Sequence, residues 1–287
     1  MGSFSKILFP TDFSKGAAYA LDNVMCLPGV REVIVQHVVS TYFEKHSHWT
    51  TLFDIHEMQK YMDMYVQTEM SNVLPKKTQT AVSYRTVVSE GKPAQQIVEL
   101  ADKEKVDLIV MGPTKGVVTG SVIRAASHPV LSVPQTNNGM KPLQKTAKML
   151  VTTDCSPQSK KVVDYAFELK DLFNCELFLL YVIELTSALK FGIRQGYFTD
   201  ASSKMRTWAK HQLENLTPHQ YVKDASVHRL VEEGPASEKI AECADSYDVD
   251  LVVLGAHGYG PVQKHFVGTT TDKILSKVSR PLLTVKI

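Results

Sequence analysis

The residues best suited to chemistry lie in the stretch GAHGYGPVQKHFVGTTTDKIL at 255–275, between an apolar run and an apparent helix. Glycines leave room for a ligand to approach backbone N–H groups, and a helix start offers free donors and a dipole that favours phosphate. The consecutive threonines 269–271 would add hydroxyl donors there. The stretch therefore predicts a phosphate site, and the alternative reading is a turn followed by a threonine N-cap.

A second polar cluster, VTTDCS at 151–156, follows an earlier apolar run. Asp154 could cap the next helix, because an N-cap carboxylate accepts backbone N–H groups. It could instead hydrogen-bond an amino or hydroxyl group of a ligand. One side chain could not easily fill both roles, so both readings stay open.

The histidines offer weaker signals. His257 and His265 lie in or beside the glycine stretch, but no carboxylate is close in sequence to orient either ring for proton transfer. His257 is better read as packing or as a hydrogen bond to phosphate. The H-S-H motif at 46–48 with His56 lacks cysteine partners and a fourth ligand, so we expect a solvated loop and no metal site.

The elements that must position these residues occur twice along the chain. KILFPTDFSKGAAYAL at 6–21 is echoed by KMLVTTDCSPQSKKVVDYAF at 148–167, which aligns Asp12 with Asp154. Two further pairs follow in the same order, at 90–112 with 233–255 and at 128–134 with 280–287. Three matches in one order indicate a duplicated domain.

Each copy alternates apolar strand-like runs with helical segments. Continuous runs such as DLVVL are typical of parallel strands buried on both faces. The sequence predicts two tandem doubly wound α/β domains, each with a five-stranded parallel sheet, over residues 1–138 and 144–287. The polar segment at 135–146 is the expected linker. The terminal runs PVLSV and PLLTV read as edge strands through which the halves could cover one another.

Composition limits the partners. The formal net charge of +2 gives no general attraction to nucleic acid or to an anionic membrane. The apolar runs are shorter than the roughly 20 residues of a transmembrane helix, and the N-terminus lacks the apolar core of a signal peptide. We therefore expect a cytoplasmic protein with no nucleic-acid and no membrane partner.

The cysteines and methionines are expected to have structural roles. The four cysteines have no C-x-x-C spacing and are expected to be reduced and buried, with a redox pair of Cys155 and Cys175 as the alternative. Met58, Met62, Met64 and Met70 are expected to face the core of an amphipathic helix; a partner-binding surface is the alternative.

The glycine spacing resembles a known family. Gly255, Gly258, Gly268 and Thr269 follow the pattern G-x2-G-x9-G-[ST] of the ATP-binding universal stress proteins, and FPTDFS, VTTDCS and VDLVVLGAHG are similar to that family's flanking strands and loops. Neither a G-x-x-x-x-G-K-[ST] loop nor a G-x-G-x-x-G after a first strand is present. Because the match recurs, the whole chain resembles a tandem universal stress protein, which implies an adenine nucleotide alpha-hydrolase-like fold and an intramolecular pseudo-dimer.

The resemblance implies a nucleotide site in the second copy. Asp154 and the neighbouring threonines would meet the adenosine end, Val182 would pack on the base, and Leu254 with Gly255 would approach the ribose. The implied cofactor-binding residues are Thr152, Thr153, Asp154, Val182, Leu254, Gly255, His257, Gly258, Gly268, Thr269 and Thr270. The implied ligand is ATP or AMP, with Mg²⁺ as an optional counter-ion and no catalytic residue assigned.

The first copy departs from this pattern. Gly112 to Pro129 spans 17 positions and Gly255 to Pro281 spans 26, so nine residues are missing (26 − 17). Either Gly116 stands for Gly268, which replaces the hydroxyls by valines, or Gly120 and Ser121 stand for Gly268 and Thr269. We expect weak or absent triphosphate binding in this copy. A reduced adenosine pocket stays open there, with the residues Thr11, Asp12, Val38 and Gly112.

The function expected from the sequence is an adenine-nucleotide-binding stress-response regulator, with the nucleotide held mainly in the second copy. The alternatives are a slow ATPase or nucleotide-transferring enzyme, and an interaction module that binds no nucleotide. A homodimer of tandem chains is a further expectation.

Overall fold

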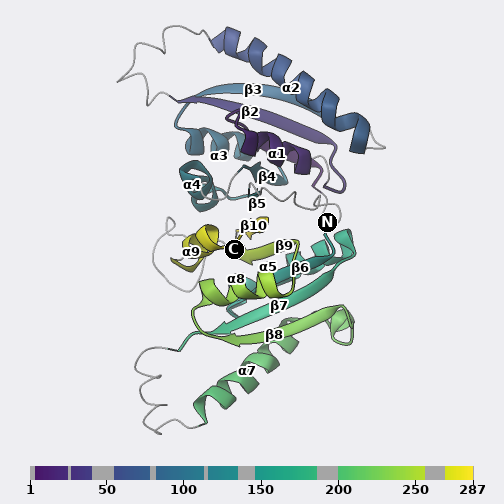
Figure 1. Cartoon of the computed structure of the whole chain (residues 1–287), viewed down its shortest axis with the longest axis vertical. Coiled ribbons are helices and arrows are strands. Elements are labelled where there is room, and N and C mark those ends of the chain that lie inside the picture. Colours follow the sequence, from purple (N-terminus) through teal and green to yellow (C-terminus); the bar gives the residue numbers. More distant parts are fainter. Residues whose placement is uncertain are drawn as a thin grey trace. The chain divides into compact units, whose positions relative to one another are not determined.

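The computed structural model describes residues 4–24, 27–40, 55–77, 82–112, 116–134, 146–185, 200–255 and 269–286. The chain divides into two compact units (Figure 1). Unit 1 comprises Met1–Lys145 and Pro281–Lys286, and unit 2 comprises Thr146–Arg280. The linker predicted at 135–146 lies almost wholly outside the described residues, so the boundaries at 138 and 144 stay a prediction.

The first sequence copy forms the expected alternation of strands and helices. Its elements are β1 (Lys6–Pro10), α1 (Lys15–Val24), β2 (Glu32–Ser40), α2 (Ile55–Lys77), β3 (Ser83–Gly91), α3 (Pro93–Glu104), β4 (Leu108–Met111), α4 (Val117–Ala125) and β5 (Val130–Ser132). The strand order is β3-β2-β1-β4-β5, with parallel pairing throughout. Because the order reverses between β1 and β4, this is a doubly wound sheet.

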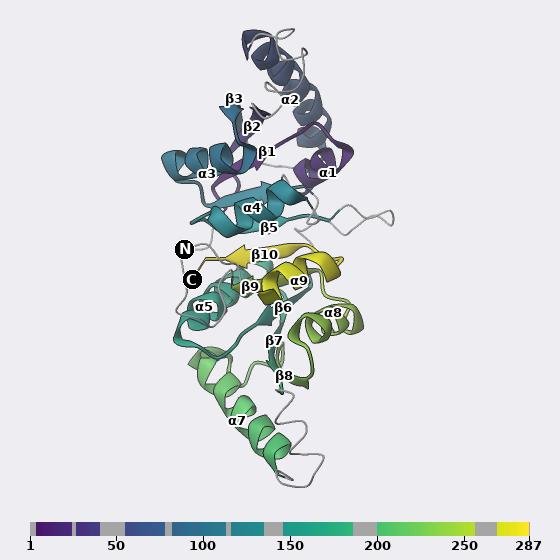
Figure 2. The same cartoon turned by 90° about the vertical axis from the view of Figure 1, so that its left-hand side faces the viewer.

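Helices cover both faces of this sheet. Figure 2 shows α1 and α2 on one face and α3 on the other, as right-handed crossovers require. The central strands are therefore buried on both sides: β4 is buried at all four positions from Leu108 to Met111. Such strands carry continuous apolar runs and no polar alternation, which is why the sequence pattern identified them.

The second copy repeats the architecture. Its elements are β6 (Lys148–Thr152), α5 (Pro157–Phe173), β7 (Glu176–Ile183), α7 (Ala201–Leu216), the 3₁₀ helix η3 (His219–Tyr221), β8 (Val227–Glu233), α8 (Ala236–Ser246), β9 (Leu251–Gly255), α9 (Thr269–Lys277) and β10 (Leu282–Val285). The strand order of this copy is β10-β9-β6-β7-β8, and the pairs from β9 to β8 are parallel. The five-stranded alternation predicted for each copy is confirmed.

The last strand, β10, belongs to unit 1 although its sequence follows unit 2. It pairs antiparallel with β5, with Leu283 opposite Leu131. The terminal strands of the two copies therefore pair, as the sequence predicted. This pairing covers the edge of β5.

Two glycines end equivalent strands with backbone that other residues rarely adopt. Gly91 ends β3 with φ 135°, and Gly234 follows β8 with φ 145°. A Cβ at Gly234 would lie 3.0 Å from Cε of Lys239. The chain turns at these points into α3 and α8, so the paired EG motifs of the sequence mark a required sharp turn.

The methionines of α2 divide between core and surface. Met62 is fully buried, as predicted, whereas Met64 is 60% exposed, so the core-facing prediction was wrong for Met64. The side chain of Met70 lies outside the described residues. Among the described residues, no helix is both long and apolar enough to span a membrane.

Candidate functional site

Two of the sequence-predicted residues of unit 2, Asp154 and Gly255, lie at the point where its strand order reverses. β6 lies between β7 and β9, with Leu150 opposite both Phe178 and Val252. Asp154 follows the carboxyl end of β6, and Gly255 ends β9. In doubly wound sheets, ligands bind outside the carboxyl ends of strands at this switch point. The fold therefore places Asp154 and Gly255 at neighbouring strand ends.

Asp154 does not cap α5. Its Oδ1 accepts a hydrogen bond from the N–H of Ser156 at 2.9 Å, which closes an Asx turn. Ser156 is the N-cap, since its Oγ accepts from the N–H of Ser159 at 3.1 Å. No described residue provides a partner for Oδ2 of Asp154. The capping reading was therefore wrong, and one carboxylate oxygen of Asp154 stays available as an acceptor.

The buried hydroxyl groups of Thr153 and Ser159 stabilise the turn that contains Asp154. Thr153 is 8% exposed, and its Oγ1 accepts the N–H of Cys155 at 3.0 Å and lies 2.8 Å from Oγ of Ser159. The N–H of Thr153 donates to the carbonyl of Leu180 at 3.0 Å, which ties the turn to β7. The Thr153 hydroxyl is thus used internally.

Cys155 occupies a conformation that few non-glycine residues adopt, with φ 59°. Burial, and after it the neighbouring Asp154 charge, raises the pKa of its thiol to about 12. Burial also raises the pKa of Cys175 to about 11. Both thiols are free and protonated at neutral pH, which is unsuited to the alternative of a redox pair.

The other predicted residues of unit 2 lie on strands, at the start of α9, or outside the described residues. Thr152 ends β6, and Val182 lies on β7, half-buried opposite Glu232. Leu254 is buried next to Gly255. Thr269 and Thr270 form the first turn of α9. The predicted residues His257, Gly258 and Gly268 lie outside the described residues.

Unit 1 repeats the turn with the same hydrogen bonds. The N–H of Ser14 donates to Oδ1 of Asp12 at 3.0 Å, and that of Phe13 donates to Oγ1 of Thr11 at 3.0 Å. Phe13 has φ 61°, matching Cys155. Gly112, which follows β4, approaches the start of α1, where a Cβ would lie 3.5 Å from the backbone N of Ala17. The backbone hydrogen bonds of this turn are therefore the same in both units.

The units differ in what packs on the turn. The Phe13 ring lies 4.6 Å from that of His37, 4.8 Å from Tyr65 and 5.6 Å from Tyr61. In unit 2 the small Cys155 replaces this ring. His37 also bonds the carbonyl of Thr11 at 2.9 Å, and Val38 follows it on β2. Aromatic packing from β2 and α2 thus holds the unit 1 turn.

The structure decides how the shortened loop of the first copy aligns. Gly116 is the N-cap of α4 and Gly268 directly precedes α9; both helices have nine residues. Gly116 therefore corresponds to Gly268, and the missing residues precede it. Val117, which is 86% exposed, and Val118 then occupy the positions of Thr269 and Thr270. The first two residues of α4 therefore carry no hydroxyl, and the third, Thr119, is buried.

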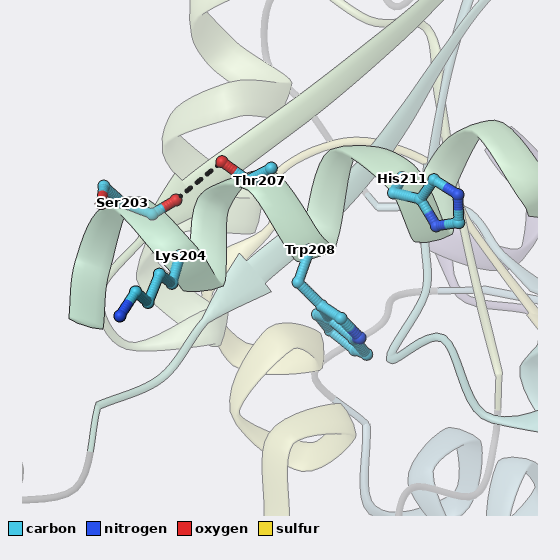
Figure 3. A pocket seen from close by; sticks show the side chains of 5 residues that line it. All are labelled: Ser203, Lys204, Thr207, Trp208 and His211. Atoms are coloured by element: carbon cyan, nitrogen blue, oxygen red, sulfur yellow. Dashed lines mark hydrogen bonds between the residues drawn. The ribbon is translucent and has the colours of Figure 1, made fainter. Parts of the chain in front are cut away.

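Other candidate sites are weak. Among the described residues, no three His, Cys, Asp or Glu side chains lie close enough to hold a metal ion. His56 lies exposed on α2, while residues 46–48 are outside the described part of the chain. A shallow hollow of about 480 Å³ lies on α7 and is lined by Ser203, Lys204, Thr207, Trp208 and His211 (Figure 3). All of its lining comes from one helix surface and none from the switch point.

Sequence reasoning missed Ser156 and Ser159. The Ser-Pro pair at 156 and 157 is a recognisable signal, because serine is a favoured N-cap and proline is favoured at the first helical position. Ser159 carried no comparable signal, since its role depends on the three-dimensional approach of Thr153.

Comparisons with known proteins agree with this architecture. The model of the universal stress protein family matches residues 3–134 and again 145–286. Universal stress protein MJ0577 of Methanocaldococcus jannaschii is 27% identical over 158 residues, covering 47% of this chain and 98% of that protein. Universal stress protein A homolog 2 of Coxiella burnetii is 28% identical over 143 residues, covering 49% and 94%.

One solved structure extends over both units. The crystal structure of a universal stress protein from Archaeoglobus fulgidus matches 100% of this chain and 99% of its own, with a TM-score of 0.69 and 18% sequence identity. At that identity the likeness concerns the fold. The duplicated architecture therefore exists in a solved structure of similar length.

Proposed function

Since the chain belongs to the universal stress protein family, we propose that it binds an adenine nucleotide, ATP or AMP, at the switch point of unit 2. The observation that carries the proposal is Oδ2 of Asp154, which has no partner among the described residues and is held at a strand end next to that of Gly255. It can accept a hydrogen bond from an amino or hydroxyl group at the adenosine end of the ligand.

The proposal assigns the phosphates to the start of α9. An α-helix leaves its first N–H groups without intrahelical partners, and these groups and the helix dipole favour an anion. Thr269 and Thr270 lie in this first turn. The preceding residues Gly258 and Gly268 carry the spacing typical of the ATP-binding members of the family.

Unit 1 lacks half of this arrangement. It keeps Thr11, Asp12, Val38 and Gly112 at its own switch point, but α4 begins with Val117 and Val118. We propose that unit 1 binds a triphosphate weakly or not at all. The protein would then act as a nucleotide-responsive regulator with one competent site.

Thermal unfolding with and without ATP, AMP and NAD tests the proposal, because a ligand that binds only the folded state raises the melting temperature. We expect a shift with ATP or AMP. Gly268→Val should abolish it, whereas Gly116→Val, at a position with φ −80° that any residue adopts, should not. Absence of a shift with every adenine nucleotide would contradict the proposal.

The enzyme alternative needs a separate measurement. Phosphate release from ATP should be at most slow in the intact protein, with Mg²⁺ present or absent. Multiple turnovers that disappear in Asp154→Ala would favour an ATPase over a binding protein.

A further inference from the structure

The hollow on α7 contains a large aromatic side chain at the surface of unit 2. Trp208 is 50% exposed, and its ring contacts that of Tyr181 on β7, with the centroids 5.8 Å apart and the ring planes at 69°. The helix is anchored on the sheet, since Nη1 of Arg206 donates to the carbonyl of Val231 on β8 at 2.8 Å and Ala209 is fully buried. The indole therefore has a fixed place, with much of its surface facing solvent.

A lysine lies next to this indole. Lys204 lies about one helical turn before Trp208, and Figure 3 shows both side chains projecting from the same side of α7. The ammonium of Lys204 has no partner among the described residues, and the lining of the hollow contains no acidic side chain. The hydroxyl of Thr207 is already used, because it donates to the carbonyl of Ser203 at 3.0 Å. The hollow thus combines an aromatic surface with an ammonium that can accept an anionic partner.

The first copy covers the equivalent aromatic residue with a ring of its own. Tyr61 on α2 and Trp208 on α7 occupy equivalent places, because each directly precedes a fully buried helix residue and each is 50% exposed. The ring of Phe13 packs edge-on against that of Tyr61, with the centroids 5.6 Å apart. In unit 2 the position of Phe13 is taken by Cys155, with φ 59° against 61°. Since a cysteine has no ring, Trp208 lacks the contact that Phe13 gives to Tyr61.

We propose that the hollow on α7 binds a small aromatic carboxylate, with its ring packed on the indole of Trp208 and its carboxylate paired with the ammonium of Lys204. Aromatic rings attract one another edge-on or offset-stacked at centroid distances of roughly 4.5–7 Å. A hydrogen bond between an ammonium and a carboxylate is stronger than one between neutral groups. Trp208 therefore selects aromatic over aliphatic acids, and Lys204 selects acids over neutral or cationic aromatic compounds.

This site is separate from the proposed nucleotide site. Successive side chains of a strand point to opposite faces of the sheet. Tyr181 contacts Trp208 of α7, so Val182, which is expected to pack on the base of a nucleotide, points to the other face of β7. The two ligands would contact opposite faces of the strand, and the inference does not rest on the proposed function.

Fluorine NMR of 4-fluorobenzoate with the full chain tests the site. We expect saturable line broadening with a Kd on the order of 1 mM, as the small size of the probe allows. The alcohol 4-fluorobenzyl alcohol keeps the ring without the charge and should bind about two- to fivefold more weakly. Cyclohexanecarboxylate keeps the charge without the aromatic ring and should displace the probe about two- to tenfold less well than benzoate. Absence of saturable broadening, or equal binding of all these compounds, would overturn the proposal.

Two pairs of matched variants locate the bound probe. Trp208→Leu should weaken binding about tenfold, whereas Tyr61→Leu, at the equivalent position of unit 1, should leave the Kd within about twofold. Lys204→Gln should weaken binding about two- to fivefold, whereas Lys210→Gln, also exposed on α7 but outside the hollow, should not. Because both lysines are exposed, this second pair keeps the test valid if Trp208→Leu fails to fold. Equal effects within the lysine pair, or within a folded aromatic pair, would overturn the proposal.

Saturating ATP separates the two sites. The broadening of the 4-fluorobenzoate signal should persist in its presence, because the hollow and the switch point use different faces of β7. Full displacement by ATP would put the probe in the nucleotide site and overturn a separate site on α7. If ATP causes no thermal shift while 4-fluorobenzoate still binds, the proposed function fails and the site on α7 stands.

Discussion

The N–H of Ser156 donates to Oδ1 of Asp154 at 2.9 Å, and this bond separates two roles that the sequence could assign to one side chain. Asp154 shapes the turn with one oxygen and leaves the other without a partner among the described residues. Ser156 takes over the N-cap of α5. The same division holds in unit 1, where Asp12 accepts the N–H of Ser14 and Oγ of Ser14 accepts the N–H of Ala17 at 3.2 Å.

Ser156→Ala should destabilise the protein by about 1 kcal/mol, because the N-cap hydroxyl that accepts the N–H of Ser159 is lost. Urea unfolding measures the change. Ser276→Ala serves as the control: its exposed hydroxyl donates to the carbonyl of Lys273 near the end of α9, and its loss should cost less than about 0.5 kcal/mol. Equal effects of the two substitutions would contradict the capping role.

Asp154→Asn should weaken ATP binding by about 10- to 100-fold, since the free acceptor oxygen can be replaced by an NH₂ donor while the turn keeps its acceptor. Isothermal titration calorimetry gives the Kd. Asp12→Asn makes the identical change in unit 1 and should leave the measured Kd within about twofold. A larger loss with Asp12→Asn would move the competent site to unit 1.

The sequence predicted the fold because its signals are local and repeated. The run Leu251–Leu254 is buried at every position, as expected for a strand covered on both faces. The duplicated EG motifs mark Gly91 and Gly234, whose positive φ values require glycine. Asp154 and Gly255 were found because parallel strands of a doubly wound sheet end at one edge.

Features that depend on contacts between residues far apart in the chain could not be predicted from the sequence. Nothing in the local pattern distinguishes Met62, which is buried, from Met64, which is exposed two positions later. The sequence predicted that terminal strands pair, but the antiparallel register that puts Leu283 opposite Leu131 follows from contacts between segments far apart in the chain. The alignment of Gly116 with Gly268 likewise required the helix start, since the sequence allowed two registers.

Asp224→Asn should remove part of the acid sensitivity of unit 2. Hydrogen bonds from the hydroxyl and N–H of Ser226, with the Lys170 ammonium 3.2 Å away, lower the pKa of Asp224 to about 2. An unfolded aspartate titrates near 3.9. The stabilisation is therefore present above about pH 4 and is lost as the pH falls toward about 2. Urea unfolding between pH 2 and 5 should show a smaller decline in the variant, and a native carboxyl that titrates near 4 by NMR would contradict the prediction.

Cys155 should resist alkylation in the folded protein at pH 8. Burial first, and the Asp154 charge second, raise the pKa of its thiol to about 12, so the thiolate fraction at pH 8 is about 10⁻⁴, against roughly a quarter for an unfolded cysteine. Labelling with iodoacetamide, read by mass spectrometry, should be about 10³-fold slower in native protein than in urea.

Because the pKa of the Cys155 thiol is raised on folding, this thiol stabilises the fold fully below about pH 9 and loses that effect as the pH rises toward 12. Asp154→Asn should lower the pKa and speed the labelling of Cys155 but not that of Cys243; rapid labelling of the native wild-type thiol would refute the assignment.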